Sequence, residues 1–207
     1  MLKYLDAFCV FINHCVHSSK KGNQKLGMIM RTISSRTREV ILPLYKHIVR
    51  PNLDYCVPVW RPHYEKDLNM LEKVQRRVTK LIDELKDLSY EERLKELNLT
   101  TIKTRYLRAD LLKTFKIVRG FEDINPSTFF TFSNRQSRNH KYKLTKSYNK
   151  YDVRKYAFSQ RVINEWNNLP DYVVNADSIN TFKGHLERNF KKIRGYYKSF
   201  EFFPVNF

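Results

Sequence analysis

The sequence predicts an almost wholly α-helical protein, an irregular helical bundle in which a larger lobe precedes a smaller C-terminal one. Apolar residues recur at intervals of three and four, helix-capping residues stand where these repeats begin, and no strand-rich segment competes. The 207 residues, 42% of them hydrophobic, suffice for a buried core. Two patches stay ambiguous: the aromatic tail 196–207 and the apolar residues 7–12, which are too short to span a membrane.

The three cysteines, Cys9, Cys15 and Cys56, are an odd set without paired spacing. This usage is typical of reduced thiols in the cytosol or nucleus rather than of a secreted disulfide framework. Cys9, His14, Cys15 and His17 can be interpreted as a metal cluster, but they lack a second ligand pair at the separation of a structural zinc site. The alternative, which we prefer, is a partly buried amphipathic segment.

A helix predicted from about Ser35 contains two prolines, Pro43 and Pro51, which are unfavourable inside a helix. Proline lacks a backbone N–H and clashes with the preceding turn, so Pro43 and Pro51 each predict a kink or a restart. The large side chains here are expected to form core and corner packing rather than a ligand site; they are Tyr45, Ile48, Val49, Leu53, Tyr55 and Trp60.

Residues 65–82 predict an amphipathic helix. Its apolar stripe consists of Leu68, Leu71, Val74, Val78 and Leu81. At 100° per residue, four cations gather on nearly the opposite side: Lys73, Arg76, Arg77 and Lys80.

Two further helices are expected downstream. Ser89 and Glu92 form a capping-box pattern, which predicts a short helix that ends near Leu97. The next helix is predicted from about Thr100 to Gly120, where glycine can adopt a left-handed cap. It should bury Leu107, Leu111, Phe115 and Val118, and its flanks carry Lys103, Arg105, Arg108, Lys113, Lys116 and Arg119.

Residues 124–151 are predicted to link two helical lobes and contain no acidic residue. Their cations alternate with aromatic rings, a combination that can follow a phosphate backbone while the rings stack on unpaired bases. The alternative is an ordinary solvated connection. The residues concerned are Arg135, Arg138, Lys141, Lys143, Lys146 and Lys150, with Phe132, Tyr142, Tyr148 and Tyr151.

The C-terminal lobe is expected as a pair of helices that is too small to be stable alone. Asp152 is predicted to cap the first helix, which ends before Pro170 and buries Phe158, Val162 and Trp166. Ser178 precedes the second, whose apolar repeat is Ile179, Phe182, Leu186 and Phe190.

The charge balance predicts a polyanionic partner. The chain has 39 Lys and Arg against 21 Asp and Glu, a formal charge of +18. Such a surface attracts DNA, RNA or anionic lipid, and charge alone does not choose among them.

Three separated blocks resemble one known family in the same order. Residues 44–80, 88–120 and 152–170 are similar to the region that follows the polymerase palm in reverse transcriptases of non-LTR (LINE-type, Jockey-like) retrotransposons. That family's metal-binding signature, an aromatic residue followed by Ala-Asp-Asp, does not occur in the sequence.

The resemblance implies a helical thumb with a C-terminal extension that grips template and primer and helps to place the element's RNA on target DNA. It divides the chain into an unmatched segment 1–22, a thumb-like region 23–123, the basic aromatic linker 124–151, the C-terminal lobe 152–193 and the tail 194–207. The palm of the full-length enzyme would supply carboxylates for two Mg²⁺ ions, so we expect no catalysis and no cofactor in this chain.

The resemblance and the charge pattern together predict which residues bind nucleic acid. We expect Lys73, Arg76, Arg77 and Lys80 to face the phosphate backbone, with further candidates Arg105, Arg108, Arg135, Arg138, Lys141, Lys143, Arg154, Lys155 and Arg161.

Three interpretations remain open at this point. The chain is a sequence-independent RNA- or DNA-binding module, an enzyme fragment that acts only with a palm supplied by another chain, or a relic of a transposable element without a selected role. A start Met at the unmatched segment fits a truncated insertion, a gene-model artefact or a short reading frame with a new beginning.

Overall fold

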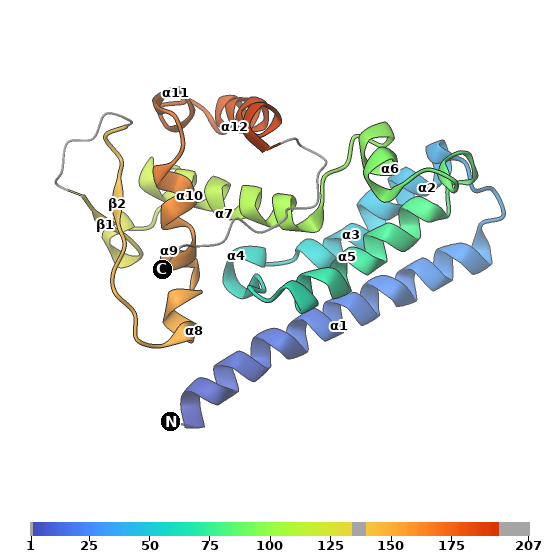
Figure 1. Cartoon of the computed structure of the whole chain (residues 1–207), viewed down its shortest axis with the longest axis horizontal. Helices are drawn as coiled ribbons and strands as arrows, with labels where there is room; N and C mark the ends of the chain where they lie inside the picture. Colours follow the sequence, from blue (N-terminus) through green and yellow to red (C-terminus); the bar gives the residue numbers. More distant parts are fainter. Residues whose placement is uncertain (1, 134–139, 195–207) are drawn as a thin grey trace.

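The fold was analysed from a computed structural model, which describes residues 2–133 and 140–194, with side chains described for residues 13–133 and 140–190. The expectation of an all-α irregular bundle is confirmed, with one small two-stranded sheet added. Figure 1 shows the arrangement of the larger helices, which are α1 (Leu2–Thr32), α2 (Arg38–Leu44), α3 (Arg50–Asp54), α5 (Glu65–Lys80), α6 (Tyr90–Glu96), α7 (Ile102–Val118) and α12 (Ile179–Arg194). No helix in the described ranges is long and apolar enough to cross a bilayer.

The first hydrophobic core lies between α1, α3, α5 and the first turns of α7. The apolar stripe predicted for α5 is its centre, since Leu71 and Val74 are fully buried. α1 packs closely here because Gly22 has no side chain: a Cβ would lie 3.2 Å from Leu53 and 3.3 Å from Val74. The unmatched N-terminal segment is therefore part of a long helix that covers this core.

The proline-containing stretch is interrupted as Pro43 and Pro51 predict. α2 passes into a π-helix at Tyr45–Val49, and α-helical bonding resumes in α3 with Pro51 in its first turn. Tyr45, Val49, Leu53 and Trp60 are buried, and Ile48 is half-buried.

Tyr55 corrects the predicted core. Its side chain is 69% exposed because the backbone turns extended at the end of α3. Its carbonyl oxygen instead accepts a hydrogen bond from the Trp60 indole, next to the short helix α4 (Val57–Trp60).

Helices α6 and α7 begin and end as their local signals predict. The Ser89 hydroxyl accepts the Glu92 N–H at 3.3 Å, and the Glu92 carboxylate accepts the Ser89 N–H at 2.8 Å. At the end of α7, Gly120 has a φ of +71°, and the Phe121 N–H bonds to the Lys116 carbonyl at 2.8 Å. This pattern is a Schellman cap, which favours glycine at that position.

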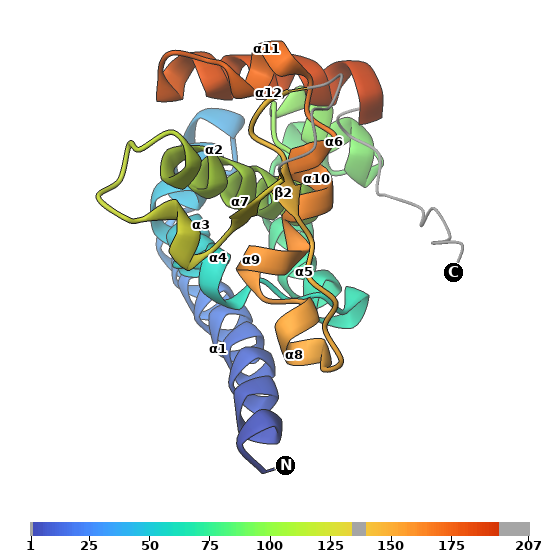
Figure 2. The same cartoon turned by 90° about the vertical axis from the view of Figure 1, so that its left-hand side faces the viewer.

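The second hydrophobic core joins the C-terminal half of α7 to α12 and the helices between them. Trp166, Phe115 and Phe182 are fully buried, and the rings of Phe115 and Phe182 stack at 4.1 Å between centroids. α7 thus contributes to both cores. Figure 2 shows α12 on one side of α7 and α1 on the other, which agrees with Figure 1.

The described parts of the predicted linker, residues 124–133 and 140–151, contain two short strands and several buried side chains. The strands β1 (Thr131–Phe132) and β2 (Leu144–Thr145) pair antiparallel, and Phe130, His140 and Leu144 are buried in or beside the second core. The sequence indicated no strand here because each strand has only two residues.

The single helix predicted from Asp152 to Pro170 is divided, which corrects that prediction. The structure has α8 (Asp152–Lys155), α9 (Phe158–Arg161) and α10 (Ile163–Asn167), followed by α11 (Asp171–Val174). Tyr151 rather than Asp152 takes the N-cap position, and the backbone turns extended at Ala157. Val162 and Trp166 are buried, whereas Phe158 is only half-buried. The remaining single turns are 3₁₀ helices at Asp83–Leu85 and Pro126–Thr128.

Candidate nucleic-acid interface

The outer side of α5 presents its four predicted cations to solvent. Lys73, Arg76, Arg77 and Lys80 are all exposed, because the residues between them face the first core. They span about 10 Å of helix at 1.5 Å per residue. In the part of the chain whose side chains are described, none of the four lies within ion-pair distance of a carboxylate.

The neighbouring helices hold two of these guanidinium groups in place. Arg77 Nη1 donates to Asn23 Oδ1 of α1 at 2.9 Å, and the Arg76 guanidinium lies 4.6 Å from the centre of the Tyr90 ring of α6. Both contacts use neutral groups, so the positive charges are positioned without being neutralised.

α1 extends this cationic surface, which the sequence reasoning did not assign. Lys20 is exposed and stands one helical turn before Asn23, so it lies on the side of α1 that faces Arg77. We call these five residues the α1–α5 basic face: Lys20, Lys73, Arg76, Arg77 and Lys80. The available signal was the absence of any Asp or Glu from residue 7 to residue 38.

Arg105 does not belong to any such surface. Its side chain is buried, with Nε bonded to Asp54 Oδ1 at 2.9 Å and Nη1 to Gln75 Oε1 at 2.9 Å. Gln75 continues the network to Glu72 and Tyr90, and the Tyr90 hydroxyl donates to Glu72. Burial raises the pKa of Glu72, while the bonds from Tyr90 and the Ile102 N–H oppose that shift.

Arg161 is likewise held inside the protein. Its Nε and Nη2 donate to the two carboxylate oxygens of Asp110 at 2.9 Å each, and Nη2 also donates to the Pro58 carbonyl at 2.7 Å. Arg61 approaches the same carboxylate at 2.8 Å, and Asp110 is fully buried. These two arginines tie the α4 region and α9 to α7, so Arg161 is corrected from a candidate contact to a structural one.

The remaining candidates are dispersed. Arg154 and Lys155 are exposed on α8, Lys141 is exposed beside the Tyr142 ring at 5.2 Å, and Arg135 and Arg138 lie outside the described residues. The half-buried Lys143 donates to the Asn167 carbonyl, and burial lowers the pKa of Lys143. Arg108 is half-buried and lies 3.9 Å from Glu187 of α12.

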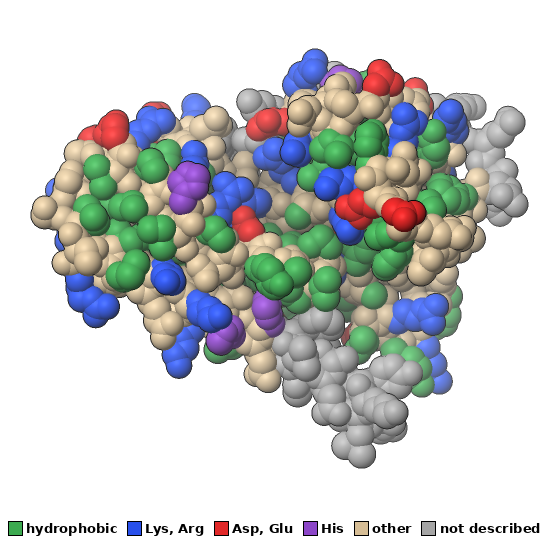
Figure 3. Space-filling model, turned by 180° about the vertical axis from the view of Figure 1, so that it is seen from behind, with side chains coloured by type: hydrophobic (Ala, Val, Ile, Leu, Met, Phe, Trp, Pro, Cys, Tyr) green, Lys and Arg blue, Asp and Glu red, His purple; other side chains and the backbone are tan. Residues whose placement is uncertain are grey.

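The basic side chains do not form one continuous patch on the face seen from behind. There, Lys and Arg side chains are spread over both lobes, and some border a hollow in the middle (Figure 3).

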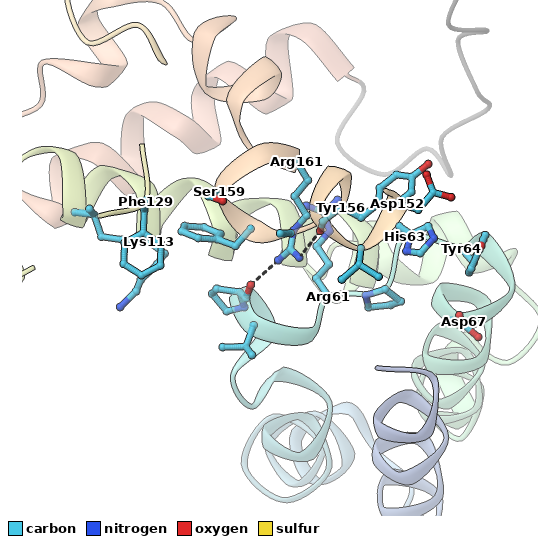
Figure 4. A pocket seen from close by; sticks show the side chains of 17 residues that line it. Arg61, His63, Tyr64, Asp67, Lys113, Phe129, Asp152, Tyr156, Ser159 and Arg161 are labelled. Carbon is cyan, nitrogen blue, oxygen red and sulfur yellow. Dashed lines mark hydrogen bonds between the residues drawn. The ribbon is translucent and has the colours of Figure 1, made fainter. Parts of the chain in front are cut away.

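A cavity of about 420 Å³ opens where α4, α7, α8 and α9 meet. Figure 4 shows Arg61 and Arg161 together at its wall and His63 beside Tyr156, whose rings stack at 3.9 Å. Burial is the main cause that lowers the pKa of His63. The walls are mostly apolar, so this cavity is unlike the charged α1–α5 basic face.

Three of the four residues of the possible metal cluster near the N-terminus are described, and they do not form a ligand group. Cys15 is fully buried, His14 packs on the Trp60 ring at 4.4 Å, and His17 is exposed. Burial and the nearby Asp67 raise the pKa of Cys15 to about 12, which disfavours the thiolate that a metal needs. Cys9 lies outside the described side chains, and residues 13–133 and 140–190 contain no group of three potential ligands.

No protein-family model, curated protein or solved structure matches the chain.

Proposed function

We propose that the chain is a non-catalytic module that binds RNA or DNA through the α1–α5 basic face, independently of sequence. The observation that carries this proposal is the outer side of α5, where four adjacent cations are exposed and have no carboxylate partner within the described residues. Cations in this state can replace the counterions that condense on phosphates, and release of those counterions drives binding.

We further propose that the module derives from the thumb and post-thumb region of a non-LTR retrotransposon reverse transcriptase. The three sequence blocks in family order support this origin, and the net charge of +18 suits a segment that grips template and primer. Under this proposal the polymerase chemistry would reside in a palm that is not part of these 207 residues.

The salt dependence of binding tests the proposal directly. If all five cations of the α1–α5 basic face contact phosphates of a duplex, affinity should fall roughly 500-fold between 50 and 200 mM monovalent salt. Fluorescence anisotropy with duplex DNA, an RNA–DNA hybrid and single-stranded RNA of one length gives the three slopes. Similar affinities for unrelated sequences are expected, and an affinity that does not change with salt would contradict the proposal.

A further inference from the structure

A second, smaller cavity lies between α3, the loop before α7, α7 itself and α12. Its volume is about 250 Å³. Four cationic side chains line it: Arg50, Arg105, Arg108 and Lys183. In the described part of the chain, Glu187 is its only acidic lining residue.

The charges of these side chains leave the cavity positive. Asp54 pairs with Arg50 and with Arg105, both at 2.9 Å, and Glu187 lies 3.9 Å from Arg108. These carboxylates offset part of the positive charge of the lining, and Lys183 on α12 is exposed. A small anion entering the cavity would meet an excess of positive charge in a partly enclosed space, where charge interactions are stronger than in bulk water.

Arg105 supplies the second observation that points to a ligand. Its side chain is 8% exposed, and its Nη2 is buried without a hydrogen-bond partner in the described residues, although its Nε and Nη1 are both bonded. A buried donor of a charged group that lacks an acceptor is costly, and native proteins rarely keep one without a reason. Because solvent does not reach Nη2, an anionic oxygen in the cavity that Arg105 lines would provide this acceptor once the guanidinium turns toward it.

We propose that this cavity is a phosphate-binding site. Guanidinium groups from α3 and α7 provide planar sets of N–H donors that match the tetrahedral oxygens of a phosphate, and the Lys183 ammonium closes the site from α12. The phosphate is either the terminal group of a nucleic-acid strand or a free phosphate. None of the five residues of the α1–α5 basic face lines this cavity, and α12 and α1 lie on opposite sides of α7 (Figures 1 and 2).

The probe for this site is inorganic phosphate. Isothermal titration calorimetry of the full chain, with chloride used to keep the ionic strength constant, should show saturable binding at one site. Lys183→Ala and Arg108→Ala should each weaken phosphate affinity roughly tenfold, because each removes one charged donor. Arg188→Ala is the matched control: it removes one positive charge from an exposed position of the same helix, and it should leave phosphate affinity unchanged.

Oligonucleotides separate the two sources of the phosphate. A strand end is the ligand if a 5′-phosphorylated oligonucleotide binds more tightly than the same oligonucleotide with a 5′-hydroxyl. Lys183→Ala should then abolish the difference in affinity. Equal binding of the two strands, with inorganic phosphate still bound, identifies a free phosphate. The double variant Arg76→Ala/Arg77→Ala should keep phosphate binding, so this test stands even if the α1–α5 basic face binds no nucleic acid. Absence of saturable phosphate binding, or equal affinity in wild type, Lys183→Ala and Arg108→Ala, would overturn the proposal.

Discussion

Helices α5 and α7 carry similar numbers of basic residues, but the protein uses them differently. On α5, the four outer cations Lys73, Arg76, Arg77 and Lys80 are exposed and lack carboxylate partners within the described residues. On α7, five of the six flanking cations form ion pairs: Lys103 with Glu65, Arg105 with Asp54, Arg108 with Glu187, and Lys113 and Lys116 with Glu122.

The difference arises from what surrounds each helix. α7 lies between the two cores, so other elements cover it on several sides and bring carboxylates to its flanks. α5 is covered on its inner side by the first core, and its neighbours α1 and α6 contact its outer cations through Asn23 and Tyr90. A basic helix face therefore indicates a polyanion-binding surface only when the tertiary structure leaves its charges unpaired.

The largest effect should come from removing a paired cation. Arg105→Ala would remove the donors to Asp54 Oδ1 and to the Gln75 amide oxygen, while Asp54 keeps Arg50 and Gln75 keeps the Tyr45 hydroxyl. Loss of two hydrogen bonds made by a charged, buried side chain is expected to cost about 3 kcal/mol of unfolding free energy. Urea denaturation measures this loss, with the exposed Lys73→Ala on α5 as the control that should change stability by less than about 0.5 kcal/mol. Equal stability losses in the two variants would remove the distinction between the helices.

Nucleic-acid affinity should depend more on the cations of α5 than on those of α7, the opposite of what we expect for stability. Arg76→Ala/Arg77→Ala should weaken binding to every sequence roughly tenfold or more and lower the salt slope by about two, because two phosphate contacts are lost. Lys103→Ala/Lys113→Ala removes the same charge from α7, where both ammonium groups already contact carboxylates, and should have a much smaller effect. Anisotropy titrations of both variants at several salt concentrations provide the comparison. Matching losses would mean that net charge alone determines binding.

The features that sequence reasoning predicted correctly depend on residues close together in the chain. The capping box of Ser89 and Glu92, the stripe of α5 and the glycine that ends α7 all involve residues within a few turns of one another. The all-α class follows because these local signals agree over most of the chain.

The features that it missed depend on distant residues. A helical projection places both Arg76 and Arg105 on the polar side of a helix. Arg105 differs because Asp54, 51 positions earlier in the chain, lies next to it and pairs with its charge. Arg161 and Asp110 are likewise 51 positions apart. The breaks at Ala157 and Val162 carry no proline or glycine signal, so a single helix was the natural prediction for 152–170.

Buried and exposed basic groups should also differ in their response to pH. His140 is 3% exposed, one ring nitrogen lies 3.2 Å from the Trp166 carbonyl oxygen, and burial is the main cause that lowers its pKa below the ordinary histidine value of about 6.5. The unfolded chain therefore binds a proton more readily than the folded protein, and His140 destabilises the fold as the pH falls below 6.5.

Thermal unfolding at a series of pH values tests this assignment. Each proton taken up on unfolding contributes at most about 1.4 kcal/mol per pH unit. His140→Gln should flatten the fall in stability on the acid side, whereas His47→Gln, at an exposed position of the π-helix Tyr45–Val49, should keep it. An unchanged acid slope in His140→Gln would assign the effect to other groups, among them His14 and His63, whose pKa values burial also lowers.

The smallest effect concerns the end of α7. A Cβ added at Gly120 would meet no atom within 4 Å, so Gly120→Ala tests the backbone conformation alone. At its φ of +71° an alanine is strained, and we expect a loss of about 1 kcal/mol of unfolding free energy.

Gly184→Ala is the matched control, since its Cβ also meets open space but the residue lies inside α12. It should stabilise the protein by about 0.5 to 1 kcal/mol, because alanine favours a helix interior. Urea denaturation should therefore give changes of opposite sign for the same added methyl group. Changes of the same sign would show that the left-handed conformation at Gly120 does not strain an alanine there.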